Sequence, residues 1–150
     1  MSHEIDMSEL AECPNCACFN LRKAARAVTQ LYDNMLRPTR LRATQFSLLV
    51  ATSLFVPISV TRLAELAVID RTTLTRNFKP LEKRGLIEVM SGKDRRTRVV
   101  SLTGRGREAL RKALPLWRKA QSRVVKELGQ ERWNSLQSHL KEVVSLASKS

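Results

Sequence analysis

Histidine, glycine and aromatic residues are scarce in this sequence, and the motifs of common enzyme active sites are missing. The 150 residues include two histidines and five glycines, and Phe, Trp and Tyr together make up 5%. No nucleophile lies in a recognisable turn motif, and no glycine-rich loop that could bind phosphate is present. We therefore expect neither an enzyme nor a protein with a bound cofactor.

Long apolar runs are also absent. The most apolar stretch, from Leu48 to Val60, is interrupted by polar residues and a proline, and it is shorter than the roughly 20 residues that span a bilayer. The first residues are acidic and lack the basic and then apolar segments of a signal peptide. These absences predict a cytoplasmic protein that does not enter a membrane.

Cysteine occurs three times, all within the motif Cys13-x-x-Cys16-x-Cys18. An odd number of cysteines does not form a disulfide framework, which fits a reducing compartment. Three interpretations of the cluster stay open. Thiols near a helix N-terminus are reactive and could form a redox switch, a metal site would need a further ligand such as His3 or a second subunit, and the thiols could instead pack as small apolar groups.

Acidic residues are few relative to basic ones. Lys and Arg number 27 against 14 Asp and Glu, which gives a formal net charge of +13. Such a charge favours polyanionic partners. Because aromatic side chains are sparse, stacking platforms for single strands are not evident. The positive charge together with the scarcity of aromatic residues favours double-stranded DNA as the polyanionic partner.

The segment from Ser59 to Thr103 has the pattern of a winged helix-turn-helix. Two short helices are predicted over Thr61–Ala67 and Arg71–Arg84, and two β-rich runs follow over Leu86–Met90 and Thr97–Leu102. A helix pair followed by a hairpin with a cationic turn is the arrangement of a winged helix-turn-helix. DNA binding is therefore the leading hypothesis.

Capping residues and apolar spacing support these two helices. Ser59 and Asp70 are predicted N-caps, because their side chains can accept hydrogen bonds from backbone N–H groups of the first helical turn. Leu63 and Leu66 of the first helix are predicted to turn inward. Gly85 is expected to end the second helix.

Amphipathic helices are predicted on both sides of this segment. Apolar residues recur at helical spacing over residues 15–37 and 104–148, and a nearly all-apolar helix is predicted over Thr44–Phe55. A winged helix-turn-helix, here residues 42–103, closes its own core and leaves these apolar stripes uncovered. We therefore expect residues 1–150 to form a single domain, mainly α with a small β-hairpin wing, whose terminal helices form a dimerisation region.

A two-fold dimer would suit DNA recognition, because it places two recognition helices about 34 Å apart and so binds a palindrome. Arg and Thr side chains on the second helix can bond base edges or phosphates in the major groove. Arginines at the hairpin turn can enter the narrow minor groove. Asp94 beside them would pair with a neighbouring Arg and bond N–H groups of the turn, or be an ordinary turn acid. The predicted DNA contacts are Arg71, Thr72, Thr73, Thr75, Arg76, Lys79, Lys93, Asp94, Arg95, Arg96 and Arg98.

Four segments carry a family resemblance: 63–66 (LAEL), 70–76 (DRTTLTR), 81–87 (LEKRGLI) and 94–103 (DRRTRVVSLT). Together they resemble the MarR (multiple antibiotic resistance regulator) family of bacterial transcriptional regulators, over nearly the whole chain. The resemblance implies a winged helix homodimer that represses transcription, with Arg96 in the minor groove and Asp94 as its supporting acid. It also implies release by a small molecule, often an aromatic acid or phenolic compound, or by cysteine oxidation.

The resemblance further implies an effector pocket between the dimer region and the DNA-binding unit. Tyr32, Phe46 and Trp117 are predicted to supply its aromatic wall, and Arg22 or Arg26 to meet a carboxylate. The alternative for these aromatic residues is an ordinary place in the core. The alternative function for the whole chain is a sequence-indifferent basic architectural or RNA-associated protein.

Overall fold

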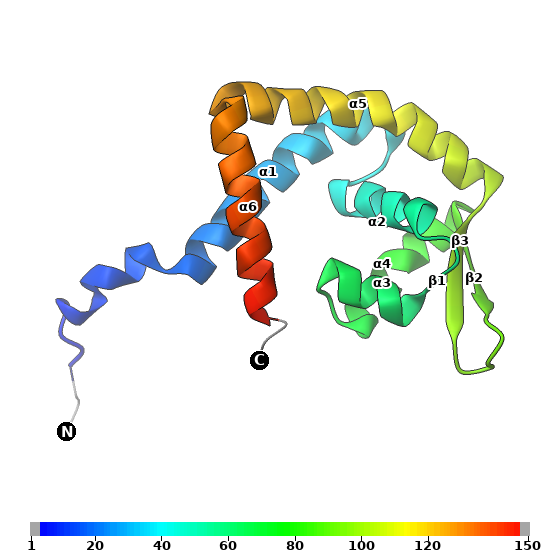
Figure 1. The fold of residues 1–150 in the computed structure, drawn as a ribbon, viewed down its shortest axis with the longest axis horizontal. Helices are drawn as coiled ribbons and strands as arrows, with labels where there is room; N and C mark the ends of the chain where they lie inside the picture. The colour runs from blue at the N-terminus through cyan, green and yellow to red at the C-terminus, as the bar shows by residue number, and fades with distance from the viewer. Residues whose placement is uncertain (1–3, 148–150) are drawn as a thin grey trace.

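The computed structural model describes residues 4–147 and confirms a mainly helical protein with a small sheet (Figure 1). Its elements are η1 (Glu9–Asn15), α1 (Ala17–Leu36), η2 (Arg37–Thr39), α2 (Ala43–Leu54), β1 (Ile58–Ser59), α3 (Val60–Ala67), α4 (Arg71–Lys83), β2 (Ile87–Ser91), β3 (Arg98–Leu102), α5 (Gly104–Leu128) and α6 (Gln130–Ala147). Figure 1 shows α2, α3, α4 and the sheet gathered at one end, with α5 leading from the sheet to α1 and α6 at the other. Within the described residues, no helix has both the length and the apolar content needed to cross a membrane.

The sheet is antiparallel, with the strand order β1-β3-β2. The hairpin of β2 and β3 pairs Ile87 with Leu102 at its base and Ser91 with Arg98 near its tip. Strand β1, which the sequence pattern did not predict, adds to the other edge of β3. Two residues are too few to show an alternating pattern in the sequence. The strand can be recognised only from its pairing with β3. The winged hairpin itself is confirmed.

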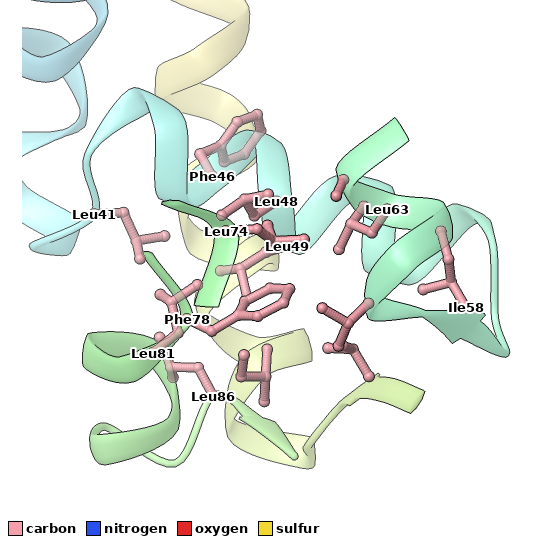
Figure 2. Close-up of a cluster of buried hydrophobic side chains, with 14 of the residues drawn as sticks. Leu41, Phe46, Leu48, Leu49, Ile58, Leu63, Leu74, Phe78, Leu81 and Leu86 are labelled. Atoms are coloured by element: carbon pink, nitrogen blue, oxygen red, sulfur yellow. The ribbon is translucent and has the colours of Figure 1, made fainter. Parts of the chain in front are cut away.

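A single apolar core holds the DNA-binding unit together (Figure 2). Leu74, Phe78 and Leu81 of α4 point into it as their spacing predicts, and each is at most 2% exposed. They meet Leu49 of α2 and Leu63 of α3. Since one face of α4 is buried in this way, its opposite face is directed to solvent.

The prediction that Leu66 turns inward is wrong, because this side chain is 42% exposed. The buried face of α3 is centred on Val60, Leu63 and Ala64. At about 100° per residue, Leu66 lies beyond the edge of that face. An exposed apolar side chain therefore lies beside the turn that leads to α4.

Predicted capping residues mark the ends of α3 and α4. The Ser59 hydroxyl accepts a hydrogen bond from the N–H of Arg62 at 3.0 Å, and an Asp70 carboxylate oxygen accepts one from the N–H of Thr73 at 2.8 Å. Gly85 follows α4 with a φ of 68°, in the left-handed region that favours glycine. The boundaries of α4 are therefore encoded by residues next to it in the sequence.

A close backbone contact joins α5 to the DNA-binding unit. The Thr103 hydroxyl accepts a hydrogen bond from the N–H of Gly106 at 3.0 Å and so caps α5, while the Thr103 N–H donates to the carbonyl of Leu86 at 3.1 Å. A Cβ at Gly106 would overlap that same carbonyl oxygen. Glycine therefore allows α5 to start directly against the residue that precedes β2.

The terminal helices pack on α5 and keep apolar side chains on their surface. The Tyr32 hydroxyl of α1 donates to the side-chain oxygen of Gln121 in α5 at 2.6 Å, and α6 packs against the end of α5. Apolar side chains that stay exposed on α1 and α6 are Phe19, Leu21, Val28, Leu136, Leu140, Val143, Val144 and Leu146. The predicted end of the last helix, residue 148, lies outside the described residues.

Candidate nucleic-acid interface

The solvent-facing side of α4 brings most of its predicted DNA contacts together. Their spacing of one, four, five and eight residues places them opposite the buried face, and all are exposed. They line a shallow hollow of about 420 Å³ and are Arg71, Thr72, Thr75, Arg76 and Lys79. Three cations and two hydroxyl groups are therefore presented on one helical surface.

Thr73 differs from the other predicted contacts on α4 because it belongs to the helix cap. Its hydroxyl and its N–H both donate to the carboxylate of Asp70. These hydrogen bonds lower the pKa of Asp70 below its ordinary value of 3.8, since they favour the charged form. The cap therefore stays ionised at neutral pH and orders the first turn of α4, where Arg71 and Thr72 lie.

The turn between β2 and β3 is held by its own hydrogen bonds. The N–H of Gly92 donates to the Thr97 carbonyl at 2.6 Å, and the N–H of Thr97 donates to the Asp94 carbonyl at 2.9 Å. The Asp94 side chain accepts from the N–H of Arg96 at 3.2 Å, as expected for an acid that shapes the turn. The prediction that Asp94 also pairs with a neighbouring arginine is wrong, because no salt bridge joins Asp94 to an arginine across residues 4–147.

The basic residues of the wing are exposed along this turn. Lys93, Arg95 and Arg96 lie between the strands, and Arg98 is the first residue of β3 rather than part of the turn itself. None of the salt bridges within the described residues includes a cation of the wing or of the exposed α4 face. Their positive charges are therefore not neutralised by the protein and are available to a polyanion.

An apolar groove between α2 and α5, the α2–α5 groove, contains two of the predicted effector residues. Phe46 and Trp117 stack there with ring centroids 6.0 Å apart and an interplanar angle of 20°. The groove has a volume of about 300 Å³ and is lined by Phe46, Ser47, Val50, Ala51, Leu54, Phe55, Leu114 and Trp117.

The other predicted effector residues do not line this groove. Tyr32 bonds Gln121 between α1 and α5, and Arg22 and Arg26 are exposed on α1. Instead, Arg107 and Arg111 of α5 line the adjoining hollow, which shares Phe46, Val50, Leu54 and Leu114 with the groove. Sequence reasoning missed these arginines, because their position depends on how α5 crosses α2.

The three cysteines lie at the junction of η1 and α1, and all are exposed. The Cys16 sulfur accepts a hydrogen bond from the N–H of Phe19 at 3.5 Å and so caps α1, while the Cys16 N–H donates to the Cys13 carbonyl at 3.0 Å. Cys13 and Cys16 are thus the two ends of one backbone turn, and Cys18 follows in the first turn of α1. Within the described residues, no group of three or more His, Cys, Asp or Glu side chains could hold a metal ion, and His3 lies outside them.

Both the sequence and the fold of this chain are similar to those of known proteins. A model of the MarR family matches residues 41–97. The transcriptional regulator MosR of M. tuberculosis, solved in complex with DNA, is 40% identical with a TM-score of 0.82 over 89% of this chain and 97% of that one. The transcriptional repressor CouR, bound to a 23-mer DNA duplex, is 25% identical with a TM-score of 0.79 over 93% of this chain and 98% of that one. A curated HTH-type transcriptional regulator of Bacillus cereus is 33% identical over 86 residues, which span 57% of each protein.

Proposed function

This chain belongs to the MarR family of DNA-binding transcriptional regulators, and from this premise we propose that it acts as a homodimeric repressor of a palindromic operator. The observation that carries the proposal is the exposed face of α4, where Arg71, Arg76 and Lys79 have no salt-bridge partner within the described residues. In this proposal α4 enters the major groove, where Arg76 bonds guanine or phosphate and the threonines contact base edges. The wing follows the backbone and inserts Arg96 into the minor groove.

The apolar surfaces of the terminal helices support a dimer. Side chains such as Phe19 and Leu146 are 58% and 66% exposed in the single chain. Contiguous exposed apolar surface is costly in water and commonly marks an interface. A second copy would cover the α1 and α6 surfaces of the first, and two-fold symmetry would place two α4 helices on successive major grooves.

Specific binding is expected to be strong relative to random DNA. At about 150 mM salt, a fragment with the palindromic operator should bind roughly 10³-fold or more tightly than a random duplex of equal length. Gel shifts and in vitro transcription from the same fragment measure affinity and repression. Equal affinity for both duplexes would instead support the sequence-indifferent architectural alternative, which depends on phosphate contacts alone.

Release by an aromatic carboxylate is proposed to occur through the α2–α5 groove. Its apolar wall suits an aromatic ring, and Arg107, which lines the adjoining hollow, suits a carboxylate. In a thermal unfolding screen of aromatic acids, a binder at 100 times its Kd should stabilise the protein by about 2.7 kcal/mol. Trp117→Leu should abolish the stabilisation, whereas Trp133→Leu, outside the groove, should keep it. If the ligand stabilised both variants equally, it would have to bind outside the α2–α5 groove.

Cysteine oxidation is the other proposed release signal. Peroxide would convert two thiols of the cluster into a disulfide, with two molecules of water formed from one H₂O₂. Since Cys16 caps α1 through its sulfur, a disulfide there would disturb the start of this helix. We expect peroxide to lower operator affinity in the wild type and to leave a Cys13→Ser, Cys16→Ser, Cys18→Ser triple variant unchanged, as measured by gel shift. The same response in both proteins would remove the oxidation signal from the proposal.

A further inference from the structure

Another hollow lies at the far end of α4 from its first turn. It has a volume of about 480 Å³, is open to solvent and is lined by the segment around η2, by Arg84 just after α4 and by the first turns of α5. We call it the α4–α5 pocket. Its charged lining residues are Arg40, Arg84, Arg105, Lys112 and Glu108. Four cations from three segments of the chain thus line the same hollow as one carboxylate.

The single carboxylate, that of Glu108, is already paired with Arg111, which does not line the pocket. Glu108 accepts hydrogen bonds from the guanidinium of Arg111 at 2.8 and 2.9 Å, and the Lys112 ammonium lies 3.7 Å from it. The hydrogen bonds from Arg111, and the positive charges of Arg111 and Lys112, lower the pKa of Glu108 to about 2. Glu108 therefore remains charged and paired, and it leaves most of the cationic lining uncompensated.

The arginines of the pocket have no carboxylate partner among the salt bridges of residues 4–147. Arg84 donates to the backbone carbonyls of Arg40 at 2.7 Å and Thr39 at 3.3 Å, which are neutral acceptors. Arg40 and Arg105 take part in none of the salt bridges within the described residues. The Arg105 side chain lies beside Gly85, next to Arg84 in the sequence. Guanidinium groups arranged around a hollow are suited to phosphate oxygens, which they bind in a bidentate manner.

We propose that the α4–α5 pocket binds a small phosphate-bearing anion and that its occupancy alters the position of α4. The volume accommodates a ligand larger than a single phosphate. Gly104, the first residue of α5, also lines the pocket, so the positive end of a 25-residue helix adds to the field of the cations. The α2–α5 groove is apolar by comparison, so the two sites would take different ligand classes.

The link to DNA runs through Arg84. This side chain ties the end of α4 to the segment after α1 across 44 residues of sequence. An anion that bonds the Arg84 guanidinium would compete with the Thr39 and Arg40 carbonyls and so shift α4 relative to α1 and α5. This coupling rests on the proposed function, whereas anion binding itself does not. Linkage requires that operator DNA change the affinity for the anion by the same factor.

Calorimetric titration of the full chain with inorganic pyrophosphate, without DNA, tests the site. We expect saturable binding that Arg105→Gln weakens about tenfold, the loss of a charge-assisted hydrogen bond. Arg118→Gln, an exposed α5 residue outside the lining, removes the same charge and should bind like the wild type. Absence of saturation, or equal affinity in both variants, would overturn the proposal.

Gel shifts with operator DNA test the coupling and one competing occupant. Pyrophosphate at a concentration near its wild-type Kd should change operator affinity in the wild type and much less in Arg105→Gln, whose site would be mostly empty; an unchanged wild type at saturation would overturn the coupling. If Arg105→Gln weakens operator binding without pyrophosphate as much as Arg96→Ala does, the pocket contacts the DNA backbone and the small-anion proposal fails. If the wild type binds no operator, the proposed function fails, while the DNA-free titration still decides the anion site.

Discussion

Arg96→Ala is expected to weaken operator binding by about 1–3 kcal/mol, or roughly fivefold to more than a hundredfold, without changing the fold or the dimer. The Arg96 side chain is exposed on the wing and has no salt-bridge partner within the described residues, so truncation removes nothing from the core. Its N–H donates to Asp94, and this backbone hydrogen bond survives the substitution. The expected loss therefore comprises the proposed minor-groove contact and the removal of one positive charge.

Matched arginine variants separate this contact from a general loss of charge. Arg95→Ala removes the same charge one residue away on the same turn, and Arg118→Ala removes it on α5. We expect Arg96→Ala to have the largest effect, Arg95→Ala a smaller one and Arg118→Ala almost none in gel shifts at several salt concentrations. Equal losses for Arg95→Ala and Arg96→Ala would show a diffuse electrostatic contact and contradict the role proposed for Arg96.

Gly106→Ala is expected to destabilise the protein by about 1–3 kcal/mol or more. The new methyl group would overlap the carbonyl oxygen of Leu86, which already accepts the N–H of Thr103. The backbone fixes the position of the Cβ, and the Leu86 carbonyl is itself a backbone group, so neither can rotate away. Either α5 must move off the start of β2, or the Thr103 hydrogen bond must break. Urea unfolding followed by circular dichroism measures the change in the free energy of unfolding.

Gly104→Ala is the control for this prediction, since it makes the same substitution two residues earlier in the same helix. A Cβ at Gly104 would meet only the end of the Arg107 side chain at 3.9 Å. The substitution should therefore stabilise the protein by up to about 1 kcal/mol, because alanine loses less backbone entropy than glycine in a helix. A small effect of Gly106→Ala, similar to that of Gly104→Ala, would show that α5 can move away from Leu86 at little cost.

Much of the fold could be predicted from local sequence. The caps at Ser59 and Asp70 were identifiable because the groups they bond lie three residues away. The inward face of α4 followed from the spacing of its leucines and phenylalanine. The cationic wing was recognisable because its charges lie in a short turn between two β-rich runs.

Several features of the candidate sites were not predictable in this way. Thr73 is one of the predicted DNA contacts, and the sequence pattern did not show that its hydroxyl also bonds the Asp70 cap. The aromatic residues Phe46 and Trp117 were predicted to line one pocket, yet the arginines that line the adjoining hollow, Arg107 and Arg111, were not among the predicted residues. Each depends on a side-chain direction or a helix crossing that a periodic pattern does not specify.

The sequence by itself determined the helices, their caps, the wing and the positive charge of the DNA-binding unit, because these depend on residues within a few positions of one another. Only the tertiary structure decided that β1 pairs with β3, that α5 starts against Leu86 at Gly106, and that Arg84 bonds the carbonyls of Thr39 and Arg40. These contacts join residues that are far apart in the chain. They form only when the apolar core brings α2, α4 and α5 together, so the α4–α5 pocket has no signature in the sequence.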